Sequence, residues 1–135
     1  MIINKNLSKM NTNHHLAFKY LESKFNKEDK NYRVIDIGGG ENSWIGDWAT
    51  HLVDKFVDPK NSSKSFGAQV FKVDIDDTKE WDLVLEDVEK NGLFDFAICS
   101  HTLEDVNNPQ VACRMINQIA KSGYISMPSK YAELT

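Results

Sequence analysis

Residues 33–40 read RVIDIGGG, a short β-branched run that reaches an acid and then three glycines. Val34, Ile35 and Ile37 give this segment apolar side chains on both faces, which is typical of a buried parallel strand. Glycine has no Cβ, so the turn that follows the strand can bring backbone N–H groups close to a ligand. The stretch therefore predicts a strand and turn that line the nucleotide side of a cofactor site.

The length, net charge and cysteine content of the chain limit the kinds of protein that it can be. Its 135 residues predict a single domain over residues 1–135. The net charge of −4, with acids and bases mixed, does not favour a nucleic-acid surface built on bulk charge. No apolar run reaches the roughly 20 residues of a membrane span, and the start lacks the apolar core of a secretory signal. Cys99 and Cys113 lack metal-ligand spacing, so we expect two reduced core thiols in a cytoplasmic protein.

Apolar spacing and turn residues divide the chain into alternating helices and strands. Residues 1–31 are expected to hold a loose start, a helix over residues 14–25 and a polar connector, and residues 32–129 a cofactor-binding core. The strands expected in the core are residues 33–37, 51–54, 70–74, 94–99 and 124–127, with helices near residues 42–49, 76–89 and from 109 onward. This alternation predicts a parallel, doubly wound sheet with right-handed crossovers.

Four of the expected strands end in chemically distinctive residues. They are the glycine turn at 38–40, Asp54, Asp74, and the pair Ser100 and His101. Because ligands of parallel sheets bind at the carboxyl ends of the strands, these residues are expected to share one site.

The spacing alone leaves the cofactor open. The dinucleotide fingerprint G-x-G-x-x-G is incomplete, because Ser43 stands at the third glycine position after Gly38 and Gly40. An acid about 20 residues on, Asp54 or Asp58, suits the ribose of a nicotinamide cofactor or of another adenosine cofactor.

From residue 33 to about residue 129 the chain resembles the class I S-adenosylmethionine-dependent methyltransferases, particularly the methyltransferase type 11-like group. The resemblance is carried by VIDIGGG at 34–40, LVD at 52–54, VDI at 73–75, FDFAICSHTLE at 94–104, Pro109 ahead of a helix, and KSGYI at 121–125. The stretch from FDF to SHTLE is the most specific, whereas the glycine turn occurs in many folds. The resemblance implies an α/β, Rossmann-like parallel sheet of about five strands in the order 3-2-1-4-5, with helices on both faces.

The resemblance also implies a role for each site residue. The methionine moiety would be bordered by Asp36, Gly38, Gly39 and Gly40, and by Ser100 and His101, which face the acceptor. Asp54 would accept hydrogen bonds from both ribose hydroxyls, and Asp74 would meet the adenine amino group with Ile75 against the ring.

Each role has an alternative. Asp36 could instead brace the glycine turn, Asp58 competes with Asp54, and Asp76 and Asp77 compete with Asp74. His101 is the one candidate base, because imidazole can take a proton near neutral pH, but it could also only contact the cofactor. Methyl transfer from a sulfonium needs alignment and exclusion of water more than a dedicated acid.

The chain departs from the family at two points. Asp105 stands where the family pattern has a second histidine, and full members continue past the fifth strand with two more strands, whereas this chain stops at Thr135. The fifth strand would then be an uncovered sheet edge, so we expect either that the chain is a fragment or that a second copy or a partner chain covers this edge. The leading hypothesis is a methyltransferase with an unidentified acceptor. The alternatives are a non-catalytic methyltransferase-like assembly module and, less favoured, an NAD-type Rossmann protein.

Overall fold

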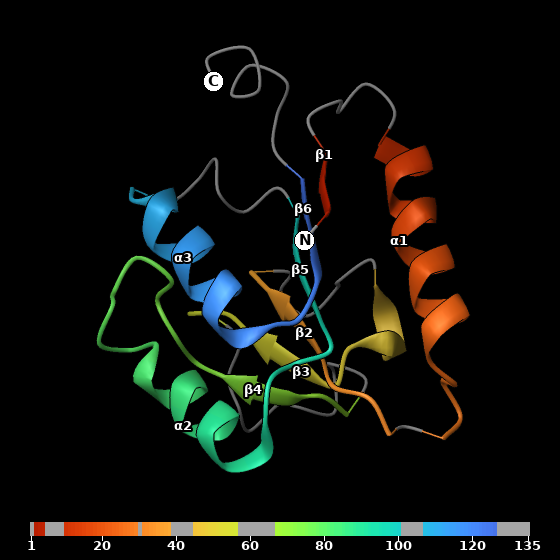
Figure 1. Cartoon of the computed structure of the whole chain (residues 1–135). Helices are drawn as coiled ribbons and strands as arrows, with labels where there is room; N and C mark the ends of the chain where they lie inside the picture. The colour runs from red at the N-terminus through yellow and green to blue at the C-terminus, as the bar shows by residue number, and fades with distance from the viewer. Residues whose placement is uncertain are drawn as a thin grey trace.

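The computed structural model of the chain describes residues 2–4, 10–29, 31–38, 45–56, 67–100 and 107–126. Its elements are β1 (Ile2–Asn4), α1 (Met10–Lys24), β2 (Val34–Ile37), η2 (Gly46–Trp48), β3 (His51–Val53), β4 (Gln69–Phe71), α2 (Asp82–Asn91), β5 (Phe96–Ser100), α3 (Pro109–Ile119) and β6 (Gly123–Ser126). All strand pairs in the sheet are parallel, and the strand order is β1-β6-β5-β2-β3-β4. The sheet separates α1 from α2 and α3, which cover its other face (Figure 1).

The predicted sheet is confirmed. The five expected strands are β2 to β6, and they lie in the order β4-β3-β2-β5-β6, which is the predicted 3-2-1-4-5. The predicted helix near residues 76–89 begins later, at Asp82. The Asp74 carboxylate accepts the N–H of Asp76 at 3.0 Å, and the Asp77 carboxylate accepts that of Lys79 at 2.9 Å. These local bonds stabilise turns in place of a first helical turn.

The sheet has a sixth strand that the sequence reading missed. Residues 2–4 belong to the start that was expected to be loose, and the fifth strand was expected to form an exposed edge; for these described residues both expectations are wrong. β1 pairs in parallel with β6, with Ile2 beside Tyr124 and Asn4 beside Ser126. The β-branched pair Ile2 and Ile3 suits a strand, and pairing satisfies the backbone groups that β6 would otherwise leave open. The predicted association through an exposed edge of β6 thereby loses its basis.

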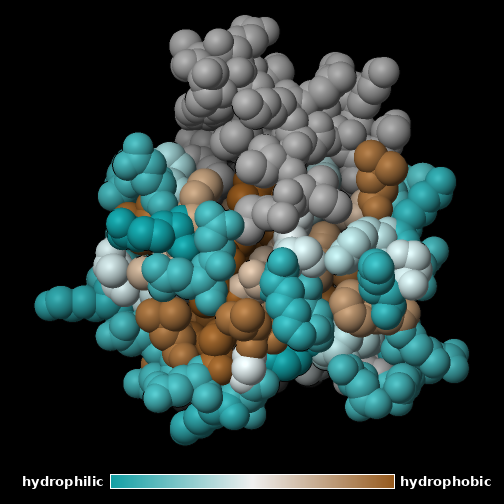
Figure 2. Space-filling model, in the orientation of Figure 1, coloured by the Kyte–Doolittle hydropathy of each residue, from teal (hydrophilic) through white to brown (hydrophobic). Residues whose placement is uncertain are grey.

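Two hydrophobic layers hold the helices on the sheet. Ile35 and Ile37 of β2 belong to the core under α2 and α3, whereas Val34 belongs to the core under α1 and η2. Figure 2 shows apolar side chains in the region of α2 and α3, where Leu85, Val88 and Cys113 pack at the margin of the first core. Cys99 is buried, and both cysteines are free thiols, as expected. Among the described helices, none combines the length and the apolar character that crossing a bilayer requires.

Candidate functional site at the carboxyl edge of the sheet

The hydrogen-bond ladder brings the glycine turn and the first candidate acid together. The N–H of Gly38 donates to the carbonyl of Val53 at 2.7 Å, and the N–H of Asp54 donates to the carbonyl of Phe71 at 3.1 Å. Since Ile37 is in register with Val53, the residues that follow them, Gly38 and Asp54, are neighbours at the carboxyl edge. Gly38 has a φ of 77°, in the left-handed region that favours glycine. Two of the four strand ends that were expected to share one site, Gly38 and Asp54, therefore lie side by side.

Asp36 and Ser100 face the α1 side of the same edge. Side chains alternate along a strand, so Asp36 points away from the core that takes Ile35 and Ile37. Asp36 is only 2 % exposed and is in register with Ile98 of β5. Ile98 also faces α1, and Ser100 follows it by two residues, so Ser100 lies on that side near the end of β5. A buried carboxylate in mid-sheet is costly unless polar groups or charges stabilise it, which makes Asp36 a structural brace or a binding group.

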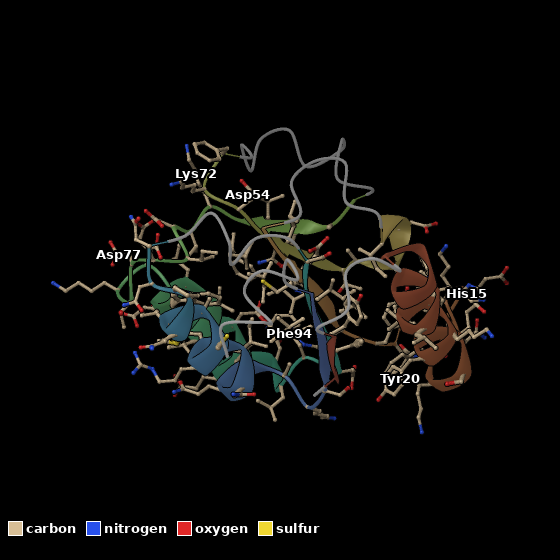
Figure 3. All side chains as sticks on the ribbon, turned by 90° about the horizontal axis from the view of Figure 1, so that it is seen from above. His15, Tyr20, Asp54, Lys72, Asp77 and Phe94 are labelled. Carbon is tan, nitrogen blue, oxygen red and sulfur yellow. The ribbon has the colours of Figure 1, made fainter. Side chains whose placement is uncertain are left out.

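Asp54 lies just beyond β3 and is partly accessible. Its Oδ1 accepts the N–H of Phe56 at 2.8 Å, which closes a local turn and orients the carboxylate. Lys72 follows Phe71, the register partner of Val53, and it lies beside Asp54 in the view from above (Figure 3). The carboxylate is therefore held at the strand ends and keeps acceptor capacity for a ligand.

The turn after β4 carries Asp74 and Ile75 on a rigid support. The Ile75 side chain is buried, and its carbonyl accepts the indole N–H of the fully buried Trp81 at 3.0 Å. The carbonyl of Asp74 accepts the N–H of Asp77 at 2.9 Å, and its Oδ1 accepts that of Asp76. Within the described residues, the second carboxylate oxygen of Asp74 makes no hydrogen bond. Asp74 can therefore still accept from a ligand without leaving its turn.

The two acids that compete with Asp74 are engaged differently. Both carboxylate oxygens of Asp76 accept backbone N–H groups, those of Asn107 at 3.0 Å and Asn108 at 2.9 Å. The Oδ1 of Asp77 accepts the N–H of Lys79 in a local turn. Among the described residues, Asp76 is thus the one of the three acids whose carboxylate bonds to the start of another element. Sequence spacing could not separate them.

Several predicted positions lie outside the described residues. They are Gly39, Gly40 and His101, together with the alternative acid Asp58 and the departure at Asp105. In the part of the chain that the structure describes, no group of three or more His, Cys, Asp or Glu side chains could hold a metal ion.

The opposite, amino end of the sheet holds a polar cluster that the sequence reading missed. His51 begins β3, is buried, and shares a hydrogen bond of 2.8 Å with Thr50 through its Nδ1. Phe94 meets the imidazole edge-on at a centroid distance of 4.9 Å, and Arg33 lies over the Phe94 ring at 4.2 Å. Arg33 also forms an ion pair with Asp87 of α2. Burial, followed by the positive charge of Arg33, lowers the pKa of His51 to about 4.

A family model described as a methyltransferase domain matches residues 8–131, nearly the whole chain. No significant match is found among curated proteins or among solved structures.

Proposed function

The chain belongs to the methyltransferase domain family, and from this premise we propose that it binds S-adenosylmethionine at the carboxyl edge of its sheet and transfers the methyl group to an acceptor. The observation that carries the proposal is the register that makes Gly38 and Asp54 neighbours at the ends of β2 and β3. A backbone without a Cβ beside an accessible carboxylate is the arrangement that an adenosine cofactor needs.

The acids at this edge suit the charge of the cofactor. S-adenosylmethionine, when bound, supplies a methyl group on a positively charged sulfur together with an ammonium group. Asp36 lies on the α1 side, two residues before the glycine turn, where its carboxylate would favour a cation. Ser100 faces the same side from β5 and would border the methionine end. These residues would bind and orient the cofactor, and alignment is the main requirement of an in-line displacement.

Asp54 and Asp74 would hold the adenosine end. Asp54 is fixed by the turn to Phe56 and would accept the ribose hydroxyls in charge-assisted hydrogen bonds. Asp74 retains an oxygen that makes no hydrogen bond within the described residues, whereas both oxygens of Asp76 are engaged, which supports Asp74 as the acid near the adenine amino group. Ile75 would lie against the adenine ring from the same turn.

Some finer assignments rest on the resemblance alone. His101 is proposed as a base or a cofactor contact, and Gly39 and Gly40 as part of the methionine border. The acceptor is not identified. A cytoplasmic location is proposed from the two free thiols.

Calorimetric titration tests the cofactor class. We expect S-adenosylhomocysteine and S-adenosylmethionine to bind with measurable heat and NAD to give none. In backbone NMR spectra, the amides of Gly38, Asp54 and Ser100 should shift on binding, whereas those of Arg33 and Asp95, at the amino end of the sheet, should not. NAD binding without S-adenosylhomocysteine binding would favour the oxidoreductase alternative. A folded sample that binds none of the three would favour the assembly module.

A further inference from the structure

We propose that Asp76 is a positioning residue for the adenosine end of the cofactor site, because it joins the turn that carries Asp74 and Ile75 to the start of α3. This inference rests on the proposed function, since it assigns Asp76 to the same site. It gives Asp76 a role distinct from ligand binding.

Asp76 joins two connections that are distant in sequence. Its Oδ2 accepts the N–H of Asn107 at 3.0 Å and its Oδ1 accepts that of Asn108 at 2.9 Å. The first partner directly precedes the second, which is the N-cap of α3, so a carboxylate of the β4–α2 connection binds the two residues just ahead of α3. The turn ahead of α2 lies beside α3 in Figure 1. Two charge-assisted hydrogen bonds from one carboxylate fix a direction as well as a distance.

The start of α3 has no local side-chain cap among the described residues, and its position favours a nearby carboxylate. Asn108 makes no side-chain capping bond in this part of the structure, and Pro109 at the first helical position has no N–H. A negative charge near the first turn of a helix is also favoured by the helix dipole. Asp76 therefore bonds the two backbone N–H groups just ahead of the helix and places its negative charge near the positive end of the helix dipole.

The other hydrogen bonds described for this turn stay within residues 74–81. The N–H of Asp76 bonds to Asp74, the N–H of Asp77 to the carbonyl of Asp74, and the indole of Trp81 to the carbonyl of Ile75. These local hydrogen bonds fix the conformation of the turn and its position next to α2. The bonds of Asp76 to Asn107 and Asn108 set where the turn lies relative to α3. They thereby set the position at the carboxyl edge of the Asp74 oxygen that makes no hydrogen bond within the described residues.

The test compares Asp76→Ala with Asp77→Ala. Both variants remove one negative charge from neighbouring positions of the same turn, but within the described residues the Asp77 carboxylate bonds only locally, to the N–H of Lys79. In the ligand-free protein, hydrogen exchange of the Asn107 and Asn108 amides, followed by NMR, should accelerate about tenfold in Asp76→Ala and stay within about twofold in Asp77→Ala. Calorimetry should show S-adenosylhomocysteine binding about three- to tenfold more weakly in Asp76→Ala alone, and Asp76→Asn, which keeps one acceptor oxygen, should fall between.

Each outcome decides the inference. Equal loss of affinity in both alanine variants would mean that charge, not the bridge to α3, matters, and would overturn it. Faster exchange with unchanged affinity would also overturn it, while leaving the proposed function intact. Absence of S-adenosylhomocysteine binding by the unaltered chain would refute the proposed function and with it the role of Asp76 in cofactor binding; the exchange measurement would still show whether the bridge exists. Both variants should melt within a few degrees of the unaltered chain, since these bonds are close to solvent.

Discussion

Acidification should destabilise this fold through His51. The pKa of His51 is lowered from 6.5 to about 4 in the folded chain, first by burial and then by Arg33. Between these two values the unfolded chain binds more protons than the folded chain, so the free energy of unfolding falls as the pH falls. From about pH 7.5 to about pH 5 the linkage relation gives a loss of about 2 kcal/mol for this one residue. Contact of the ring with solvent reduces the expected loss to about 1–2 kcal/mol.

The His51→Phe variant isolates this contribution. A phenyl ring fits beside Phe71 and Phe94, which already contact the imidazole, but it cannot take a proton. Carboxylates also titrate in this range, so the quantity to measure is the difference between the variant and the unaltered chain. Urea unfolding at several pH values should show the variant losing about 1–2 kcal/mol less than the unaltered chain between pH 7.5 and pH 5.

A second variant controls for the loss of any histidine. His15 is exposed on α1, so His15→Gln should keep the pH dependence of the unaltered chain. Parallel stability curves for His51→Phe and the unaltered chain would refute the reasoning, because they would show that the ring is not held neutral by its surroundings.

Two further variants test the cofactor edge and the sheet. Asp54→Asn removes the charge but keeps an acceptor for the N–H of Phe56, so S-adenosylhomocysteine should bind about 30-fold more weakly, or about 2 kcal/mol, by calorimetry. An equal loss in the charge-matched Asp77→Asn would argue against a specific ribose contact. Gly123→Ala should lower the free energy of unfolding in urea by about 1–3 kcal/mol, because a Cβ there would lie 2.7 Å from the carbonyl oxygen of Ala97. The exposed Lys121→Ala should cost less than about 0.5 kcal/mol, and an equal cost for both would contradict the close approach of β5 and β6.

The parallel core of the fold could be predicted because its signals are local. A short β-branched run such as residues 34–37 predicts a buried strand from its own residues. Pro109 likewise predicts the start of α3. The same holds for the candidate site, since Gly38 and Asp54 become neighbours once two parallel strands are placed side by side.

The features that were missed depend on distant parts of the chain. The strand Ile2–Asn4 is too short to stand out, and it forms because β6 offers an unpaired edge. Asp74, Asp76 and Asp77 look alike in sequence, and only the position of α3 separates Asp76 from the others. The burial of His51 could not be predicted from the residues next to it in sequence, because it depends on contacts with the distant Phe71 and Phe94.

The pairing of β1 with β6 also has a consequence for the order of assembly. It joins the first described strand to the last, so the sheet cannot be completed until the intervening chain has left the ribosome. Contacts of such long sequence separation carry a large loop-closure entropy and slow the approach to the native state. During that interval β6, and before it β5, would present unpaired backbone to other nascent chains. Deleting residues 1–4 should therefore leave more product in inclusion bodies even where the soluble fraction retains its native spectrum.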